Sequence, residues 1–446
     1  MRRTLLSEPS TLGATCVSAD AAGRGSPEVD VVTTPATDLR PLLVNASDTG
    51  GSATATKRIH RGLCRIGVDS RMLVQEKSTD DPTIHGPEST LGRAWSLARP
   101  HVDMLPLRLY GRSSGFGVNW LPERKLDRIR DIDPDVVHLN WVWRGTLSVR
   151  TIGRLDRPVV WRLPDMAALT GGCHYADGCD GFTERCGACP QLDSDSAFDL
   201  SRLTWHRKDR YWDDLDLTVV APSTWLAEQA RRSSLFGDER IEVIPNALDT
   251  DTYRPRDPQL GLDFFDLPGD KRLVLFGAVD PMGDHRKGAD LLQEALQSLS
   301  GDLEDVELVV FGANRPENPP DFGFPTHYVG YLHDDPSLVL LYSAADVMVV
   351  PSRYEGFGQT VSESLACGTP VVAFDATGPK DIVDHRETGW LAEAYDPTEL
   401  ADGVAWVLAD EARRTELDER ARIAASERYE QTVIARRYAE LYRQVV

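Results

Sequence analysis

Residues 351–372 have the sequence PSRYEGFGQTVSESLACGTPVV, and this stretch decides the fold. A buried strand is predicted to end at Pro351, and Gly356 and Gly358 allow the backbone of the next loop to approach a ligand closely. A helix is predicted to begin just after this loop, where its free backbone N–H groups suit a phosphate. Another strand is predicted from Thr369. The order strand, loop, helix, strand is typical of a parallel α/β unit.

Two carboxylates lie on either side of the start of this helix. Glu355 is in the loop, and Glu363 is about two turns into the helix at a rise of ~1.5 Å per residue. Two carboxylates roughly 10 Å apart can hold opposite ends of one nucleotide sugar. An isolated pair would be interpreted as surface glutamates beside a turn, but the surrounding loop and helix favour a ligand site.

The same alternation of strands and helices extends outward from this stretch in both directions. Val-rich runs of this kind are typical of strands buried on both faces of a parallel sheet. Strands are predicted at 40–45, 67–74, 134–139, 157–161, 272–277, 306–312, 345–351 and 369–374, with helices at 53–63 and 289–299. The sequence therefore predicts an α/β protein of two Rossmann-like, doubly wound domains. Ligands of such sheets bind beyond the carboxyl ends of the strands, which places the site between the domains.

The chain divides at changes in composition. The predicted parts are a poorly ordered N-terminal extension (1–39), an N-terminal Rossmann-like domain (40–245) with a Cys-rich insertion (170–190), a linker (246–270), a C-terminal Rossmann-like domain (271–426) and a C-terminal helix (427–446). At 446 residues the chain is long enough for two cores.

With these features the sequence resembles the retaining glycosyltransferases of family 4, which have the GT-B fold. The defining features are the two glutamates separated by seven residues and the Ala-x-Gly-x-Pro-Val-Val strand that follows them. The resemblance implies that Glu355 contacts the donor sugar near the reacting carbon and that Glu363 holds the ribose hydroxyls. It also implies that the backbone at Gly356, Phe357 and Gly358 approaches the sugar and the diphosphate.

Two further segments match the family. Arg286 and Lys287 precede Gly288 in a basic step that, by resemblance, grips the diphosphate and neutralises the charge that develops on it. Many relatives also carry an arginine where this chain has Ala278, and Arg286 is the candidate to replace it. Gly50 and Gly51 match the family's glycine loop, which closes over the donor phosphates and the acceptor.

The resemblance covers roughly residues 40–446 and implies an enzyme, a hexosyl-type glycosyltransferase that retains the anomeric configuration. The expected partners are a nucleotide-sugar donor and a glycan or lipid-linked acceptor, in the synthesis of cell-surface polysaccharide or glycoprotein glycans. No catalytic metal is expected. A phosphorylase or epimerase of the same fold and a catalytically silent donor-binding subunit remain as alternatives, because a fold does not fix a reaction.

Four of the seven cysteines fall within seventeen residues: Cys173, Cys179, Cys186 and Cys189. The last two form a Cys-x-x-Cys pair, a spacing that suits a tetrahedral Zn²⁺ site. A cytoplasmic cluster of this kind is more often a metal site than a set of disulfides. A structural zinc is therefore the favoured interpretation, with disulfides and free thiols left open.

The family's usual His-Asp pair before this insertion aligns with Pro164 and Asp165, so the histidine is missing. His174 and Asp165 are candidates to replace it. His138 is a third candidate, although a histidine at the end of a buried strand is more often part of the core.

The composition excludes some partners and favours a location. The chain has 46 Asp, 24 Glu, 42 Arg and only 7 Lys, for a net charge of −21. An acidic surface without a basic stripe makes nucleic acid an unexpected partner. The shortage of lysine resembles the composition of halophilic proteins, with a merely acidic enzyme as the alternative. No export signal or membrane span is predicted, so we expect a cytoplasmic protein, with peripheral contact at the inner face of the membrane left open.

Overall fold

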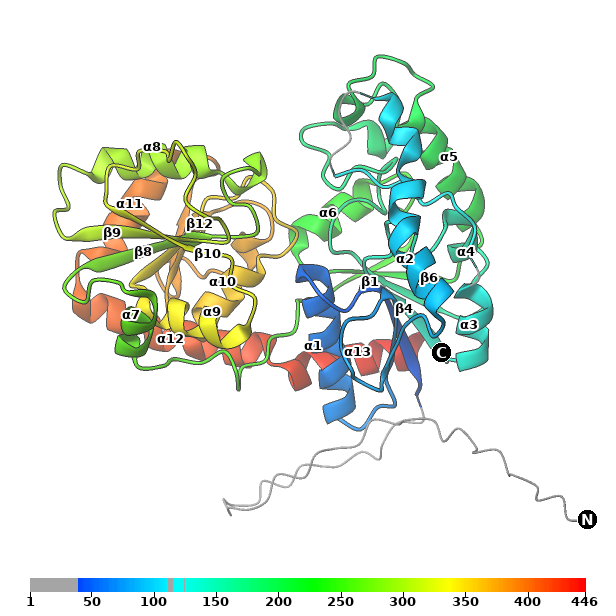
Figure 1. Ribbon diagram of the computed structural model, residues 1–446, viewed down its shortest axis with the longest axis horizontal. Helices are drawn as coiled ribbons and strands as arrows, with labels where there is room; N and C mark the ends of the chain where they lie inside the picture. The colour runs from blue at the N-terminus through cyan, green and yellow to red at the C-terminus, as the bar shows by residue number, and fades with distance from the viewer. Residues whose placement is uncertain (1–38, 111–114, 124) are drawn as a thin grey trace, which may run out of the picture.

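The computed structural model describes residues 39–110, 115–123 and 125–446 (Figure 1). The extension predicted at 1–39 lies outside these residues, apart from Leu39. Figure 1 shows two α/β domains side by side, each built around one parallel sheet. The predicted architecture of two Rossmann-like domains is confirmed.

The N-terminal sheet has seven strands in the order β3-β2-β1-β4-β5-β6-β7. Its strands are β1 (Pro41–Ser47), β2 (Arg71–Glu76), β3 (Ile84–His85), β4 (Val136–Leu139), β5 (Val159–Arg162), β6 (Leu217–Ala221) and β7 (Arg240–Val243). Its helices are α1 (Gly51–Arg65), α2 (Thr90–Asp103), the 3-10 turn η1 (Leu105–Leu109), α3 (Lys125–Ile132), α4 (Val149–Ile152), α5 (Leu200–Trp212) and α6 (Thr224–Arg232). The Cys-rich insertion lies between β5 and α5 and contains two short 3-10 turns, η2 (Gly181–Thr183) and η3 (Pro190–Leu192).

The C-terminal sheet has six strands in the order β10-β9-β8-β11-β12-β13. Its strands are β8 (Arg272–Gly277), β9 (Val306–Phe311), β10 (Thr326–Gly330), β11 (Val347–Val350), β12 (Val371–Phe374) and β13 (Gly389–Ala392). The helices and turns are α7 (Pro258–Phe265), η4 (His285–Lys287), α8 (Ala289–Leu299), α9 (Asp335–Ala344), α10 (Gln359–Ala366), η5 (Pro379–Asp381), α11 (Pro397–Leu408) and α12 (Glu411–Tyr429).

The strands β8, β11 and β12 of this second sheet are buried on both faces, as their Val-rich composition predicts, whereas the edge strand β10 is only partly buried. Along β8, Leu273 and Leu275 belong to one hydrophobic core and Val274 and Phe276 to another, because successive side chains of a strand point to opposite faces. The two cores make the domain three layers thick, with the sheet in the middle. The carboxyl ends of the strands are then the free edge from which loops can build a site.

The last helix, α13 (Gln431–Val445), does not stay with the domain that precedes it. The chain bends at Glu430, and α13 lies beside α1 of the N-terminal domain (Figure 1). Ile434 and Tyr438 share one hydrophobic core with Leu43 and Ile59, all four being fully buried. The end of the chain therefore completes the first domain. Within the described residues, no helix is long and apolar enough to cross a membrane.

Candidate active site

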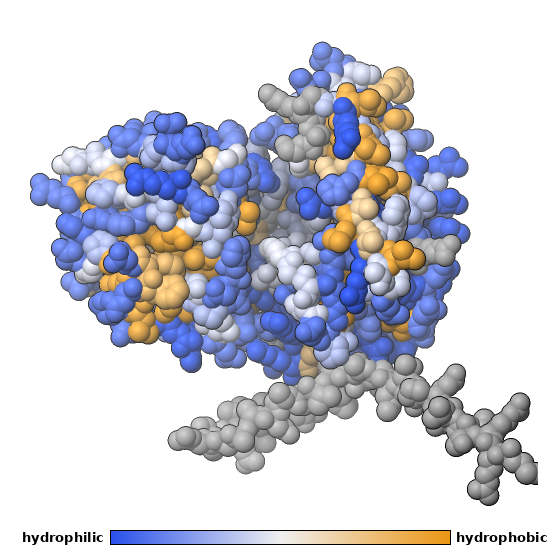
Figure 2. Space-filling view, in the orientation of Figure 1, coloured by the Kyte–Doolittle hydropathy of each residue, from blue (hydrophilic) through white to orange (hydrophobic). Residues whose placement is uncertain are grey.

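Loops that follow the parallel strands of both sheets meet between the two domains, and Figure 2 shows the surface hollowed there. The loop after β1 reaches α10 through Gly51, whose carbonyl oxygen accepts a hydrogen bond from Gln359 Nε2 at 2.9 Å. The segment after β5 reaches the loop after β11, where the Gly356 N–H donates to the Tyr175 hydroxyl at 3.2 Å. The predicted site residues of both domains therefore line one region.

Lys287 and Glu355 form an ion pair in the loops that follow β8 and β11. Lys287 Nζ lies 2.6 Å from Glu355 Oε2, and both side chains are partly exposed. Gly288 brings the two loops together: it has φ 70°, and a Cβ atom there would lie 1.9 Å from the Pro351 carbonyl oxygen. Only glycine fits this position. The pair places one cation and one carboxylate where loops from β8 and β11 meet.

Arg286 has different partners from Lys287. Its guanidinium donates to the Asp284 carboxylate, with Nε 3.0 Å from Oδ1, and lies 4.7 Å from the centre of the Tyr175 ring. Arg286 therefore links its own turn to the N-terminal domain. The structure brings it beside the same hollow, with its charge already balanced by Asp284.

Glu363, in the second turn of α10, is buried and paired across the domains. Arg58 of α1 donates to Glu363 Oε1 at 2.8 Å, and the Tyr342 hydroxyl donates to Oε2 at 3.2 Å. Burial raises the pKa of Glu363, and the Arg58 guanidinium offsets this only in part. Both carboxylate oxygens keep a free lone pair for another donor, because each oxygen can accept two hydrogen bonds.

Arg58 is absent from the sequence-based predictions. Its guanidinium is almost fully buried and also stacks over the Tyr253 ring at 4.9 Å. A signal does exist in the sequence: Ala55, Ile59 and Gly62 mark the apolar face of α1, and Arg58 lies on that same face. A cation on the buried face of a helix needs a carboxylate partner elsewhere in the fold.

The glycines predicted to approach the donor have separate structural roles. Gly50 has φ 91° and starts α1, and no neighbouring atom lies near the position of its missing Cβ. Gly358 has φ 105° and starts α10. Gly356 is needed for contact between the domains, because a Cβ there would lie 2.7 Å from the Pro164 carbonyl oxygen. Phe357 is buried, and its ring packs against Tyr429.

The N-terminal wall of the site contains a histidine and a carboxylate. His174 Nδ1 lies 2.7 Å from Asp165 Oδ2, at the end of the loop that follows β5. Trp141, after β4, donates from Nε1 to the same oxygen at 3.1 Å. By contrast, His138 is fully buried 2.5 Å from the Tyr442 hydroxyl, and burial lowers its pKa to about 3. His138 is therefore a core residue, as its position in a buried strand indicates.

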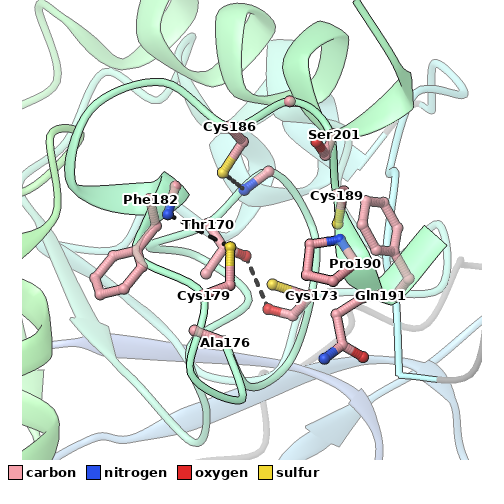
Figure 3. Close-up of a pocket in the computed structure, with 14 residues that line it drawn as sticks. Thr170, Cys173, Ala176, Cys179, Phe182, Cys186, Cys189, Pro190, Gln191 and Ser201 are labelled. Atoms are coloured by element: carbon pink, nitrogen blue, oxygen red, sulfur yellow. Dashed lines mark hydrogen bonds between the residues drawn. The ribbon is translucent and has the colours of Figure 1, made fainter. Parts of the chain in front are cut away.

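The four clustered cysteines surround one small cavity in the insertion (Figure 3). All four carry free thiols. Backbone N–H groups approach two of the sulfurs, from Gly171 to Cys186 Sγ at 3.1 Å and from Gly181 to Cys179 Sγ at 3.4 Å. In the described part of the chain, no three His, Cys, Asp or Glu side chains form a group that could hold a metal ion. The arrangement as it stands does not fit zinc, and the zinc site stays a prediction.

Each domain of the chain matches a family model. Residues 50–247 match the model described as "Glycosyl transferase 4-like domain", and residues 267–424 match "Glycosyl transferases group 1". The two matches fall on the two domains, with β1 before the first match and α13 after the second. They support a glycosyltransferase family of the GT-B type.

Curated relatives match over about half of their length. A D-inositol 3-phosphate glycosyltransferase from Xylanimonas cellulosilytica is 36% identical over 235 residues, which cover 47% of this chain and 54% of the relative. The protein of the same name from Thermomonospora curvata is 35% identical over 213 residues, covering 43% of this chain and 49% of the relative. The chain thus spans only about half the length of the curated relatives that it matches.

Solved structures match over nearly the whole chain at low identity. Sucrose-phosphate synthase from Thermosynechococcus elongatus superposes with a TM-score of 0.64 and 19% identity, covering 91% of this chain and 99% of that one. HepE from Anabaena in complex with UDP-glucose gives a TM-score of 0.61 and 16% identity, covering 91% of this chain and 100% of that one. The fold is therefore GT-B, as predicted.

Proposed function

We propose that this chain transfers a sugar from a nucleotide-sugar donor to a hydroxyl of a glycan or lipid-linked acceptor. Its two domains match glycosyltransferase models, and together they form the GT-B fold. We further propose that transfer retains the anomeric configuration. The observation that carries the proposal is the ion pair between Lys287 and Glu355, which joins the loops that follow β8 and β11. That HepE was solved with UDP-glucose supports a nucleotide sugar as the donor.

Different groups of the site suit the diphosphate, the sugar and the ribose of the donor. Lys287 would neutralise the diphosphate as it leaves, the kind of charge stabilisation that dominates such reactions. The start of α1 at Gly50 and Gly51 offers free backbone N–H groups to the same phosphates. Glu355, one residue before the close contact at Gly356, would accept hydrogen bonds from the sugar.

The ribose hydroxyls suit Glu363. Its carboxylate has a lone pair left on each oxygen, and Arg58 orients it through a hydrogen bond of 2.8 Å. Retention requires the acceptor to attack from the face that the diphosphate leaves. The protein's contribution is then to hold both substrates in that geometry and to stabilise the departing charge.

A lipid-linked acceptor and contact with a membrane draw support from the surface of α2 and η1. Five large apolar side chains are exposed on these two elements: Leu91, Trp95, Leu97, Leu105 and Leu109. Arg93 and Arg108 lie on the same segment of a chain whose net charge is −21. An apolar face with a tryptophan and arginines is typical of helices that lie in a membrane interface.

A hollow of about 710 Å³ adjoins this surface and is lined by Arg93, Leu97, Ser78 and Arg128, among others. It offers polar groups to a headgroup next to an apolar face for a lipid tail. Vesicles of anionic phospholipid should sediment with the protein, and Trp95→Ser should reduce the bound fraction. Leu260→Ser, at an exposed leucine on α7, is the control and should bind like the unaltered chain.

The test of the proposed reaction begins with donor binding. UDP-, GDP- and ADP-sugars are screened by thermal shift, and the best binder is then assayed for hydrolysis and for transfer to added glycans. Lys287→Ala should abolish turnover, whereas Lys271→Ala, at the opposite end of β8, should not. Binding without hydrolysis or transfer would indicate a silent subunit, and turnover that requires inorganic phosphate would indicate a phosphorylase.

A further inference from the structure

The N-terminal domain holds the loop that follows β11 at one buried residue, Gly356. Its N–H donates to the Tyr175 hydroxyl at 3.2 Å, and its carbonyl oxygen accepts from Ser223 Oγ at 2.8 Å. A Cβ atom there would lie 2.7 Å from the Pro164 carbonyl oxygen, so glycine is the residue that allows this close approach. Three segments of one domain thus meet the residue that directly follows Glu355 in the chain.

The ring of Tyr175 makes a second contact with the C-terminal domain. The Arg286 guanidinium lies 4.7 Å from the centre of this ring, within the range of a cation–π interaction. Asp284 holds the same guanidinium from its own turn, with Arg286 Nε 3.0 Å from Oδ1. Tyr175 therefore contacts both segments that carry the central ion pair, the turn of Lys287 and the loop of Glu355.

The chain on both sides of Tyr175 is held in place, so its side chain has a defined position. The His174 carbonyl accepts from the Met166 N–H at 2.9 Å, and Ala176 is buried in a hydrophobic core of the N-terminal domain. The Tyr175 ring also stacks on that of Trp225 on α6, with 6.3 Å between the ring centres and an angle of 18°. The N-terminal domain therefore presents an ordered tyrosine to the loop of Glu355.

The ion pair itself depends on such support. Lys287 and Glu355 are both partly exposed, and neither lies on an α-helix or a strand. Side chains on loops take a precise position only when packing and hydrogen bonds hold the backbone beneath them. A displacement of about 1 Å in a reacting group can lower a rate roughly 100-fold. The hold on Gly356 therefore has a consequence for the rate of transfer.

We propose that Tyr175 is a positioning residue of the reaction: its hydroxyl sets the backbone that carries Glu355, and its ring sets the guanidinium of Arg286. This inference rests on the proposed function. It gives the Cys-rich insertion a role in placing the loops of the opposite domain, because Tyr175 lies in the chain between Cys173 and Cys179, which line the cavity in Figure 3.

The first test needs no substrate and measures the hydrogen bond itself. In Tyr175→Phe the ring beside Arg286 remains, but the Gly356 N–H loses its acceptor. Hydrogen exchange, followed by mass spectrometry on overlapping peptides, should show faster exchange at Gly356 than in the unaltered chain. Unchanged exchange at Gly356 would overturn the inference whether or not the chain is a transferase.

Tyr110→Phe is the matched control. The Tyr110 hydroxyl accepts from the Leu200 N–H at 2.9 Å, a bond of the same kind that lies within the N-terminal domain. This variant should lower the Tm by a similar amount, but exchange at Gly356 should stay that of the unaltered chain.

The second test separates positioning from stability by enzyme kinetics, with the best donor from the UDP-, GDP- and ADP-sugar panel. Tyr175→Phe should lower kcat roughly 10- to 100-fold, the range for a displacement of up to about 1 Å, with little change in donor KM. Tyr175→Leu also removes the ring beside Arg286 and should raise donor KM as well. Tyr110→Phe should keep the kcat and KM of the unaltered chain.

The kinetic outcomes distinguish the inference from the proposed function. A kcat for Tyr175→Phe equal to that of Tyr110→Phe, while Lys287→Ala is inactive, would overturn the role of Tyr175 alone. If Lys287→Ala were also fully active, the proposed site itself would be wrong, and the inference would be wrong with it.

Discussion

The two domains supply their parts of the site in different ways. In the proposed site, the residues of the C-terminal domain are Lys287, Glu355 and Glu363, which lie in short motifs after β8 and β11. Those of the N-terminal domain are Arg58 on α1 and the Asp165–His174 pair, which come from separate segments of the chain. A contiguous motif is visible in one sequence, whereas the pairing of distant residues is not, even where the position of a residue such as Arg58 shows that it needs a partner.

The largest expected effect tests the contiguous motif of the C-terminal domain. Glu355→Ala should lower kcat by roughly 100-fold or more, the cost of removing one group that acts on transition-state charge. It also leaves Lys287 without its 2.6 Å partner. Glu363→Ala should mainly raise KM for the donor. Steady-state kinetics with the best donor measures both, and Glu393→Ala, an exposed site in the same domain, is the control.

Near wild-type kcat and KM in both glutamate variants would show that the motif does not mark the site. The contrast between the domains would then be wrong, since the C-terminal domain would contain no contiguous motif that marks the site.

The next effect concerns the residue that the motif does not reveal. Arg58→Ala leaves the Glu363 carboxylate buried without its cation, which should cost about 3–5 kcal/mol of stability. Donor KM should rise as well. Chemical denaturation measures the first effect, and Arg61→Ala, an exposed arginine on α1, is the control. A loss no larger than that of the control would mean that the domains do not make this contact in solution.

Lowering the pH should change the stability of the two domains in opposite directions. Burial lowers the pKa of His60 to about 4 and that of His138 to about 3, from an ordinary 6.5. Below pH 6.5 the unfolded chain therefore binds more protons than the native N-terminal domain, and stability falls as the pH decreases toward these values. For His60 the loss is roughly 3 kcal/mol at ~1.4 kcal/mol per pKa unit.

The C-terminal domain contains an opposite case. Burial raises the pKa of Asp418 on α12 to about 7 from an ordinary 3.8, so the native state binds more protons between these values. Its contribution to stability therefore grows as the pH falls from 7 toward 3.8. Hydrogen exchange at pH 7 and pH 5, corrected for the intrinsic exchange rate at each pH, should show lower protection factors in α1 and β4 and higher protection factors in α12. An equal loss of protection in both domains would contradict this difference.

Removing a metal ion from the Cys-rich insertion should have a smaller and more local effect on stability. If the four cysteines bind zinc, protein purified without added metal should contain about one Zn²⁺ per chain, and chelation should lower the Tm while loosening the loop that holds His174. The four sulfurs would have to move together, since they do not form a metal site as they stand. A zinc content near zero, with two intact disulfides by mass spectrometry, would rule the metal out.

Salt should change the difference in stability between the two domains least, because it acts on both domains alike. An acidic chain with only 7 lysines should become more stable as KCl rises from low to molar concentration, since ions screen its self-repulsion. The measurement is Tm against KCl concentration. A flat or falling Tm would remove the halophilic interpretation and leave an ordinary acidic protein.

Local patterns predicted the regular elements well where burial is uniform. The helix predicted at 289–299 is α8, and the strand predicted at 272–277 is β8, with the same bounds. The strand predicted at 67–74 begins later, at Arg71, because Gly67 takes φ 83° in a turn. β7 has the sequence RIEV and is only partly buried, so its composition does not separate it from a loop.

The residues of the candidate site fall into two groups: those that lie in local motifs and those that only the tertiary fold brings together. Glu355 and Lys287 were named by resemblance to family motifs, whose residues lie close together in the chain. Arg58 could not be predicted as the partner of Glu363, because the contact depends on how two domains meet. His174 could be named as a candidate, but its bond to Asp165 exists only because the insertion folds back onto the end of β5.

The position of α13 has a consequence for how the chain is made. The apolar face formed by Leu43 and Ile59 is covered by Ile434 and Tyr438, which follow the whole second domain in the chain. During translation the first domain must wait, with that face open, while the entire second domain is made and folds. The nascent chain is therefore exposed to aggregation and to chaperones until α13 has been made. Completion of α13 is the step that closes the first domain.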